Sequence, residues 1–96
     1  MKKYELMFIV KTTIESDKIN NTIETYKKLI TDSKGEIIFK KDMGQRKLAY
    51  PINKETNGNY YVIDFTSNAE TLSELDRKLG IDENIIRHLI IKLEEE

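Results

Sequence analysis

The sequence has 96 residues, of which 39% are hydrophobic and 34% are charged, a composition typical of a soluble globular domain. It contains no cysteine, which excludes disulfides and thiolate metal sites and fits a reducing cytoplasm. We therefore expect one domain over residues 1–96 and a cytoplasmic location. The first residues lack the apolar run of a signal peptide, and no apolar run approaches the roughly 20 residues that span a membrane.

Charge is distributed unevenly along the chain, although the formal net charge is only −1. Residues 1–54 have 12 basic and 7 acidic side chains, a net charge of +5, whereas residues 55–96 have 4 basic and 10 acidic side chains, a net charge of −6. Such asymmetry is typical of a basic binding surface, and solvated lysines alone produce it as well. Charge alone leaves the two interpretations open.

The first part of the chain predicts a strand followed by a helix. Residues 4–10 alternate between two faces, one with Tyr4, Leu6, Phe8 and Val10 and the other with Met7 and Ile9. Polar residues over 12–16 can cap a helix that runs from about Ser16 to Ser33 and stops before Gly35. The apolar stripe of this helix consists of Ile19, Ile23, Tyr26 and Ile30.

The second part predicts three more strands and a second helix. A strand over 36–41 continues towards Arg46, a loop with Pro51 follows, and Asn57-Gly58 is a strong turn signal. The third strand covers 59–66, and the last covers 85–93. Between them, a helix capped by Ser67 or Asn68 and stopped by Gly80 has an apolar stripe of Leu72, Leu75 and Leu79.

This order of elements predicts an α+β fold of the ferredoxin-like, split βαβ type, with a four-stranded antiparallel sheet and two helices on one face. The other face should alternate between apolar and polar side chains if water covers it. It does not alternate, because apolar side chains point there at Met7, Ile9, Tyr60 and Val62, and the last strand adds Leu89 and Ile91. An exposed apolar face is typical of a partner site, while scattered surface hydrophobes are normal.

The residues offer little for catalysis, metals or cofactors, and we expect none of the three. His88 is the one histidine, and its place in an apolar strand favours a structural role. No spacing of His, Asp and Glu suits a metal, and no glycine-rich phosphate loop is present. The third strand departs from an RNA-recognition motif at Asn59, Tyr60 and Asp64, so the usual base-stacking platform is not expected.

Basic residues are candidates for phosphate contacts. Lys2 and Lys3 precede the first strand, and a second group surrounds the second strand, at Lys40, Lys41, Arg46, Lys47 and Lys54. A solvated hairpin is the alternative for any single lysine.

Three segments resemble the bacterial small-subunit ribosomal protein six family. The most specific is Gly44-Gln45-Arg46-Lys47-Leu48-Ala49-Tyr50-Pro51-Ile52-Asn53-Lys54, which is similar to the family's signature. The opening strand over 3–10 and the last strand over 84–92 are also similar to those of the family, so the resemblance covers essentially the whole chain in order.

The resemblance implies a non-enzymatic protein of the small ribosomal subunit, without a small-molecule substrate or a membrane partner. It implies binding to ribosomal RNA in the central platform region, jointly with small-subunit ribosomal protein eighteen. We assign RNA contacts to Lys2, Lys3, Arg46, Lys47 and Arg87. We assign partner contacts to Met7, Ile9, Tyr60, Val62, Leu89 and Ile91. Tyr50 and Pro51 are expected to shape the signature segment, and Leu48 and Ile52 to pack.

Two other functions are compatible with the fold, since fold does not fix function. One is a small-ligand-binding regulatory module that forms a homodimer through its sheet and needs no basic loop. The other is an acylphosphatase-like hydrolase, which requires an anion-binding loop after the first strand. The segment 11–14, Lys-Thr-Thr-Ile, has neither glycine nor arginine for such a loop.

Overall fold

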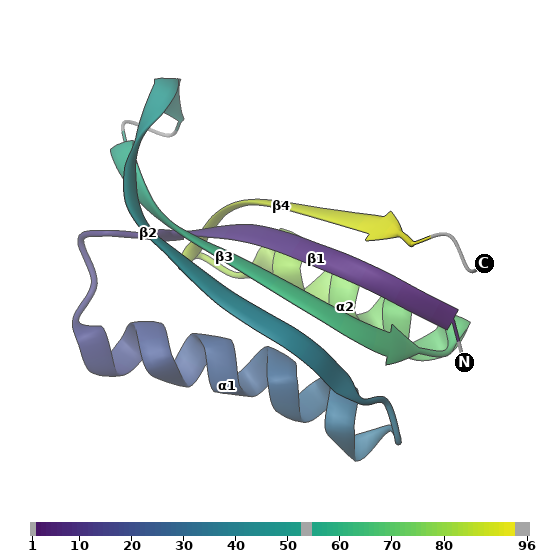
Figure 1. Ribbon diagram of the computed structural model, residues 1–96. Coiled ribbons are helices and arrows are strands. Elements are labelled where there is room, and N and C mark those ends of the chain that lie inside the picture. Colours follow the sequence, from purple (N-terminus) through teal and green to yellow (C-terminus); the bar gives the residue numbers. More distant parts are fainter. Residues whose placement is uncertain (1, 53–54, 94–96) are drawn as a thin grey trace.

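The computed structural model describes residues 2–52 and 55–93. In chain order, its elements are β1 (Lys2–Lys11), α1 (Ser16–Asp32), β2 (Ile37–Ile52), β3 (Glu55–Ser67), α2 (Ala69–Ile81) and β4 (Ile85–Lys92). The strands form one antiparallel sheet in the order β2-β3-β1-β4, and both helices lie on the same side of it (Figure 1). The predicted ferredoxin-like fold is confirmed.

The core lies between the helices and one face of the sheet. Alternation along β1 directs Leu6, Phe8 and Val10 into this layer, where none of them is exposed to solvent. The predicted partners from the other elements meet them there, namely Ile19, Ile23, Ile30, Tyr61, Ile63, Phe65, Leu72, Leu75 and Leu79. Burial of each such side chain contributes roughly 1.5–3 kcal/mol, so this layer fixes which face of the sheet remains uncovered.

The helix ends follow local rules with two departures from the predictions. Asn68 caps α2 as expected, because its side chain accepts a hydrogen bond from the Thr71 amide at 2.8 Å. Gly80 does not stop that helix, which continues to Ile81. At the end of α1 the left-handed residue is Lys34, with φ of 70°, and the Gly35 amide donates to the Ile30 carbonyl.

The predicted loop around Pro51 and the turn at Asn57-Gly58 are wrong. Strand β2 continues to Ile52 and β3 begins at Glu55, so both segments belong to a long hairpin. We call its outer part, residues 44–52 and 55–60, the arm; it bends away from the helices (Figure 1). Lys54 of the predicted loop lies outside the described residues.

Gly58 serves close packing within the sheet instead of a turn. It is buried and pairs with Lys11 of β1 and Arg46 of β2. A Cβ atom at this position would lie 2.2 Å from the Cγ2 atom of Ile9. Glycine therefore lets the Ile9 side chain lie directly over the β3 backbone.

Substitution of Gly58 by alanine should destabilise the protein. The added methyl group forces Ile9 and its strand to shift, and overpacking of this kind costs about 1–3 kcal/mol. Gly80→Ala is the matched control, because its Cβ would meet only the His88 ring at 3.9 Å and alanine favours a helix by up to ~1 kcal/mol. Urea denaturation gives both free energies of unfolding. Equal stability of the two variants would contradict the packing role of Gly58.

Candidate functional site

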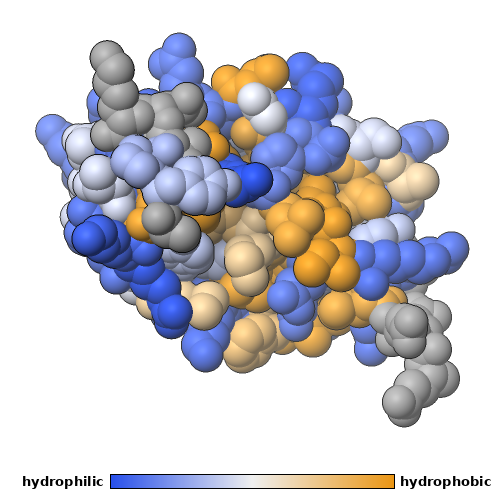
Figure 2. Space-filling model, turned by 90° about the horizontal axis from the view of Figure 1, so that it is seen from above, coloured by the Kyte–Doolittle hydropathy of each residue, from blue (hydrophilic) through white to orange (hydrophobic). Residues whose placement is uncertain are grey.

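The face of the sheet opposite the helices, here called the open face, is the candidate site. Along β1, Glu5, Met7 and Ile9 alternate with the core residues and therefore point to this side. Residues directly opposite each other in neighbouring strands share a face, so the register identifies the rest of the surface. Figure 2 looks onto this side and shows apolar side chains gathered in its middle, with polar ones around them.

The six predicted partner residues come together on the open face. Met7 lies between Val62 of β3 and Leu89 of β4. Ile9 lies between Tyr60 and Arg87, and Ile91 pairs with Glu5 in the next row. Their exposure differs, since Leu89 and Ile91 are 54% and 44% exposed, whereas Ile9 and Val62 are below 10%. Of these six residues, the two on β4 are therefore the ones that a partner can reach most easily.

A hydrogen bond from Arg87 of β4 connects the open face to the arm. The Arg87 guanidinium donates a hydrogen bond from Nη1 to the Tyr50 hydroxyl at 3.0 Å, joining β4 to β2 across 37 residues of sequence. Leu48 of the arm is buried, as predicted for a packing residue. These contacts agree with the shaping role predicted for Tyr50, while the prediction for Ile52 falls on a side chain that is not described.

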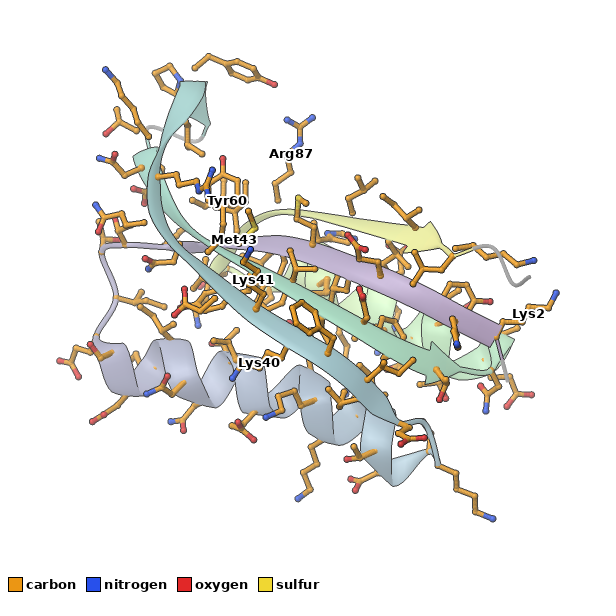
Figure 3. The ribbon with its side chains drawn as sticks, in the orientation of Figure 1. Lys2, Lys40, Lys41, Met43, Tyr60 and Arg87 are labelled. Carbon is orange, nitrogen blue, oxygen red and sulfur yellow. The ribbon has the colours of Figure 1, made fainter. Side chains whose placement is uncertain are left out.

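The five predicted RNA-contact residues form two groups at opposite ends of the sheet. Lys2 and Lys3 begin β1 and pair with the end of β3, whereas Arg46 lies beside Gly58 at the other end of β1. At about 3.3 Å per residue, the nine steps along the strand from Lys2 to Lys11 separate the groups by roughly 30 Å. Figure 3 shows Lys2 far from Arg87, which lies near the arm with Tyr60. A single phosphate group cannot contact both ends.

The basic group around β2 is also divided between the two faces. Lys41 pairs with Val62 and Arg46 with Gly58, which places both on the open face. Lys40 pairs with the core residue Ile63 and points towards α1 (Figure 3). Lys47, next to Arg46 in the strand, has the opposite orientation.

Sequence reasoning missed one basic residue of the open face. Lys11 pairs with Gly58, which in turn pairs with Arg46, so the two cations flank the glycine in one row. Lys11 is two residues after Ile9 in β1 and therefore shares its face, and this spacing was the signal that could have found it. Lys11, Arg46 and Arg87 make the arm end of the open face basic, and we call these three residues the basic end.

An acidic pair lies at the other end of the apolar surface. Glu5 and Asp64 are directly opposite each other in β1 and β3. In the same row, Phe39 of β2 flanks Asp64 and Ile91 of β4 flanks Glu5. Neither carboxylate forms an ion pair among the residues that the structure describes. Atom Oδ1 of Asp64 is buried without a hydrogen-bond partner.

The electrostatics of this pair are unfavourable in the isolated chain. Partial burial raises the pKa of Glu5, and the charge of Asp64 and a hydrogen bond to it raise this pKa further. Like charges directly opposite each other in a sheet are destabilising. The sequence did not reveal this pair, because its two members are 59 positions apart and only the β1–β3 register brings them together.

His88 has a structural contact on the other side of the sheet. Its Nε2 atom lies 2.8 Å from the Oδ1 atom of Asp76 in α2, and the ring is mostly buried.

Within residues 2–52 and 55–93, no group of three or more His, Asp or Glu residues could hold a metal ion. Neither helix has the length and apolar character needed to cross a membrane.

Comparisons with known proteins agree with this architecture. Residues 3–92 match the family described as ribosomal protein S6. Small ribosomal subunit protein bS6 of Campylobacter hominis is 47% identical over 94 residues, which cover 98% of this chain and 65% of that protein. The protein of the same name from Clostridium acetobutylicum is 43% identical over 95 residues, covering 99% of this chain and 100% of the relative.

A solved structure extends the likeness to three dimensions. The crystal structure of 30S ribosomal protein S6 from Thermotoga maritima superimposes with a TM-score of 0.89 at 34% sequence identity, covering 96% of this chain and 87% of that one. The chain thus belongs to a class of structural proteins of the small ribosomal subunit, and not to a class of enzymes. Its family is ribosomal protein S6, as the signature segment predicted.

Removal of one charge from the acidic pair should stabilise the isolated protein at neutral pH. Because the folded-state pKa of Glu5 is raised, its contribution to stability is present below pH 4.5 and is lost as the pH rises through the folded-state pKa. Asp64→Asn should therefore raise the free energy of unfolding at pH 7 by roughly 0.2–1 kcal/mol, and by less at pH 3.

Denaturant titrations at the two pH values measure this difference. Glu83→Gln is the control, because it removes a carboxylate that is exposed in the turn before β4. A loss of stability in the Asp64→Asn variant at pH 7 would contradict the repulsion between Glu5 and Asp64.

Proposed function

We propose that this protein binds ribosomal RNA in the central platform region of the small subunit, jointly with small-subunit ribosomal protein eighteen. Its place of action is the ribosome in the cytoplasm. Membership of the ribosomal protein S6 family supports the ribosomal role. Protein eighteen is the partner that the family resemblance implies, and no reaction is part of this function.

One observation carries the proposal of joint binding: the open face combines a basic end with an apolar middle. Arg46, Lys11 and Arg87 lie on the same side of the sheet as Met7 and Leu89. An RNA backbone at the basic end and a protein on the apolar rows would thus lie side by side. Each surface alone is small, so we expect binding of either ligand to favour binding of the other.

The chemistry of the basic end suits a phosphate backbone. Arg46 and Lys11 flank Gly58, which adds no side chain between them. The hydrogen bond to Tyr50 uses one of the five N–H donors of Arg87 and holds its guanidinium beside the arm. The remaining N–H groups can donate hydrogen bonds to two oxygens of one phosphate, as in bidentate arginine–phosphate pairs. Contacts of this kind position the protein on RNA without reading its sequence.

Lys2 and Lys3 make a second, separate contribution in this proposal. They are exposed at the far end of β1 and would contact a different stretch of RNA from the basic end. Binding at both ends would hold two RNA segments in a fixed relation about 30 Å apart. We propose that the protein stabilises one arrangement of an RNA junction in this way, by binding it better than the alternatives.

Neutralisation of Arg46 should weaken RNA binding. We expect Arg46→Gln to lower the affinity of the protein, in the presence of protein eighteen, for a central-domain RNA fragment by about tenfold at moderate salt. The slope of log affinity against log salt should fall by about 0.7–0.9 for one lost phosphate contact. Fluorescence anisotropy across a salt series measures both quantities.

Lys28→Gln is the matched control, since Lys28 is an exposed cation on α1, on the other side of the molecule. It should leave affinity and slope unchanged. Equal binding by Arg46→Gln and Lys28→Gln would rule out the basic end as the RNA surface. A wild-type protein that binds neither the RNA nor protein eighteen, and instead forms a stable homodimer, would favour the ligand-binding alternative.

A further inference from the structure

The acidic pair within the apolar face remains without a role in RNA binding. Glu5 and Asp64 would repel phosphate, and their neighbours in the row are the apolar side chains of Phe39 and Ile91. Both neighbours are well exposed, at 50% and 44%. The row thus presents two carboxylates between two apolar side chains, and these carboxylates would repel the phosphate groups of RNA.

From this row we infer that the open face docks a protein partner that seats an arginine side chain on Glu5 and Asp64. This inference rests on the proposed joint binding and adds the chemistry by which the partner is recognised. The arginine would lie between Phe39 and Ile91, with apolar side chains of the partner packed on the next row, at Met7 and Leu89.

Geometry favours a guanidinium over other groups. Directly opposite residues in a sheet have Cβ atoms about 4.5–5.5 Å apart, so the two carboxylates present their oxygens side by side. A planar guanidinium offers five donors and bridges two such acceptors, whereas a lysine ammonium is a point charge. Phe39 supplies an aromatic ring beside the seat, which attracts a cation over its face.

Neither of the two described lysines nearest to the acidic pair on the open face fills this seat. Lys3 and Lys41 share the open face and lie one row away on either side, opposite Thr66 and Val62 respectively. Neither forms an ion pair with Glu5 or Asp64 in the part of the chain that the structure describes. An arginine of a partner protein would supply the positive charge that these two lysines do not.

A second copy of this chain is a poorer occupant. A two-fold interface uses the same patch on both subunits, so an interface centred on this row would bring four carboxylates together. A partner with an exposed arginine among apolar side chains avoids this repulsion and replaces the water lost on burial with charge-assisted hydrogen bonds.

The test measures the affinity of protein eighteen for the full chain by isothermal titration calorimetry, with Glu5→Gln, Asp64→Asn and the control Glu83→Gln. We expect each substitution in the acidic pair to weaken binding by at least about tenfold, and the control to bind like wild type. Thermal unfolding of the free variants is the second readout, and the pair variants should be at least as stable as wild type.

The outcomes separate the two proposals. If wild type binds protein eighteen and both pair variants bind it equally well, the arginine seat is wrong and joint binding stands. If wild type does not bind protein eighteen even with the RNA fragment present, the proposed function itself fails. If the free chain forms a homodimer that the pair substitutions weaken, the occupant is a second copy and the inference is overturned.

Discussion

The register between β1 and β3 is the constraint on which the rest of the structure depends. It pairs Leu6 with Ile63 and Phe8 with Tyr61 on the side of the helices, and Glu5 with Asp64 on the other side. A slip of one residue would turn every side chain of β1 to the opposite face, so burial of the core specifies the register strongly. The same pairing therefore determines both the stability of the fold and the composition of the open face.

The position of β1 in the middle of the sheet extends this constraint to the other strands. Because β3 and β4 both pair with β1, the positions of Glu5, Met7 and Ile9 determine which residues of β3 and β4 lie beside them on the open face. Ile9 packs over the backbone of Gly58. Gly58 belongs to the arm and lies between Lys11 and Arg46 of the basic end. Acidic, apolar and basic parts of the surface thus follow one another along a single strand, within reach of one partner protein and one RNA segment.

Alternation and helical periodicity predicted the element order and the core, because both depend on local spacing. They also placed Met7, Ile9, Tyr60 and Val62 on the correct face. The arm was missed because Asn57-Gly58 looks like a turn locally, whereas its conformation depends on Ile9, almost 50 positions away. Register shifts in β2 likewise hide which face Lys40 and Lys41 occupy.

The open face itself remained ambiguous in the sequence, since the exposure of each side chain depends on its neighbours in the folded sheet. Ile9 and Val62 had the same pattern as Leu89, yet only Leu89 is well exposed. The acidic pair could not be predicted, because it depends on the register between β1 and β3, and no local sequence rule gives that register. The signature segment predicted the family, but only the structure showed how the residues of that segment are arranged.

We expect the open face, and not the helical side, to be the surface that binds the RNA and the partner protein. Hydroxyl-radical footprinting of the protein, free and in complex with central-domain RNA and protein eighteen, tests it most directly. We expect labelling of Phe39, Leu89 and Ile91 to fall on complex formation, while Ile81 on α2, which is 69% exposed, is labelled equally in both states. Protection of Ile81 with unchanged labelling of the three open-face side chains would contradict the account.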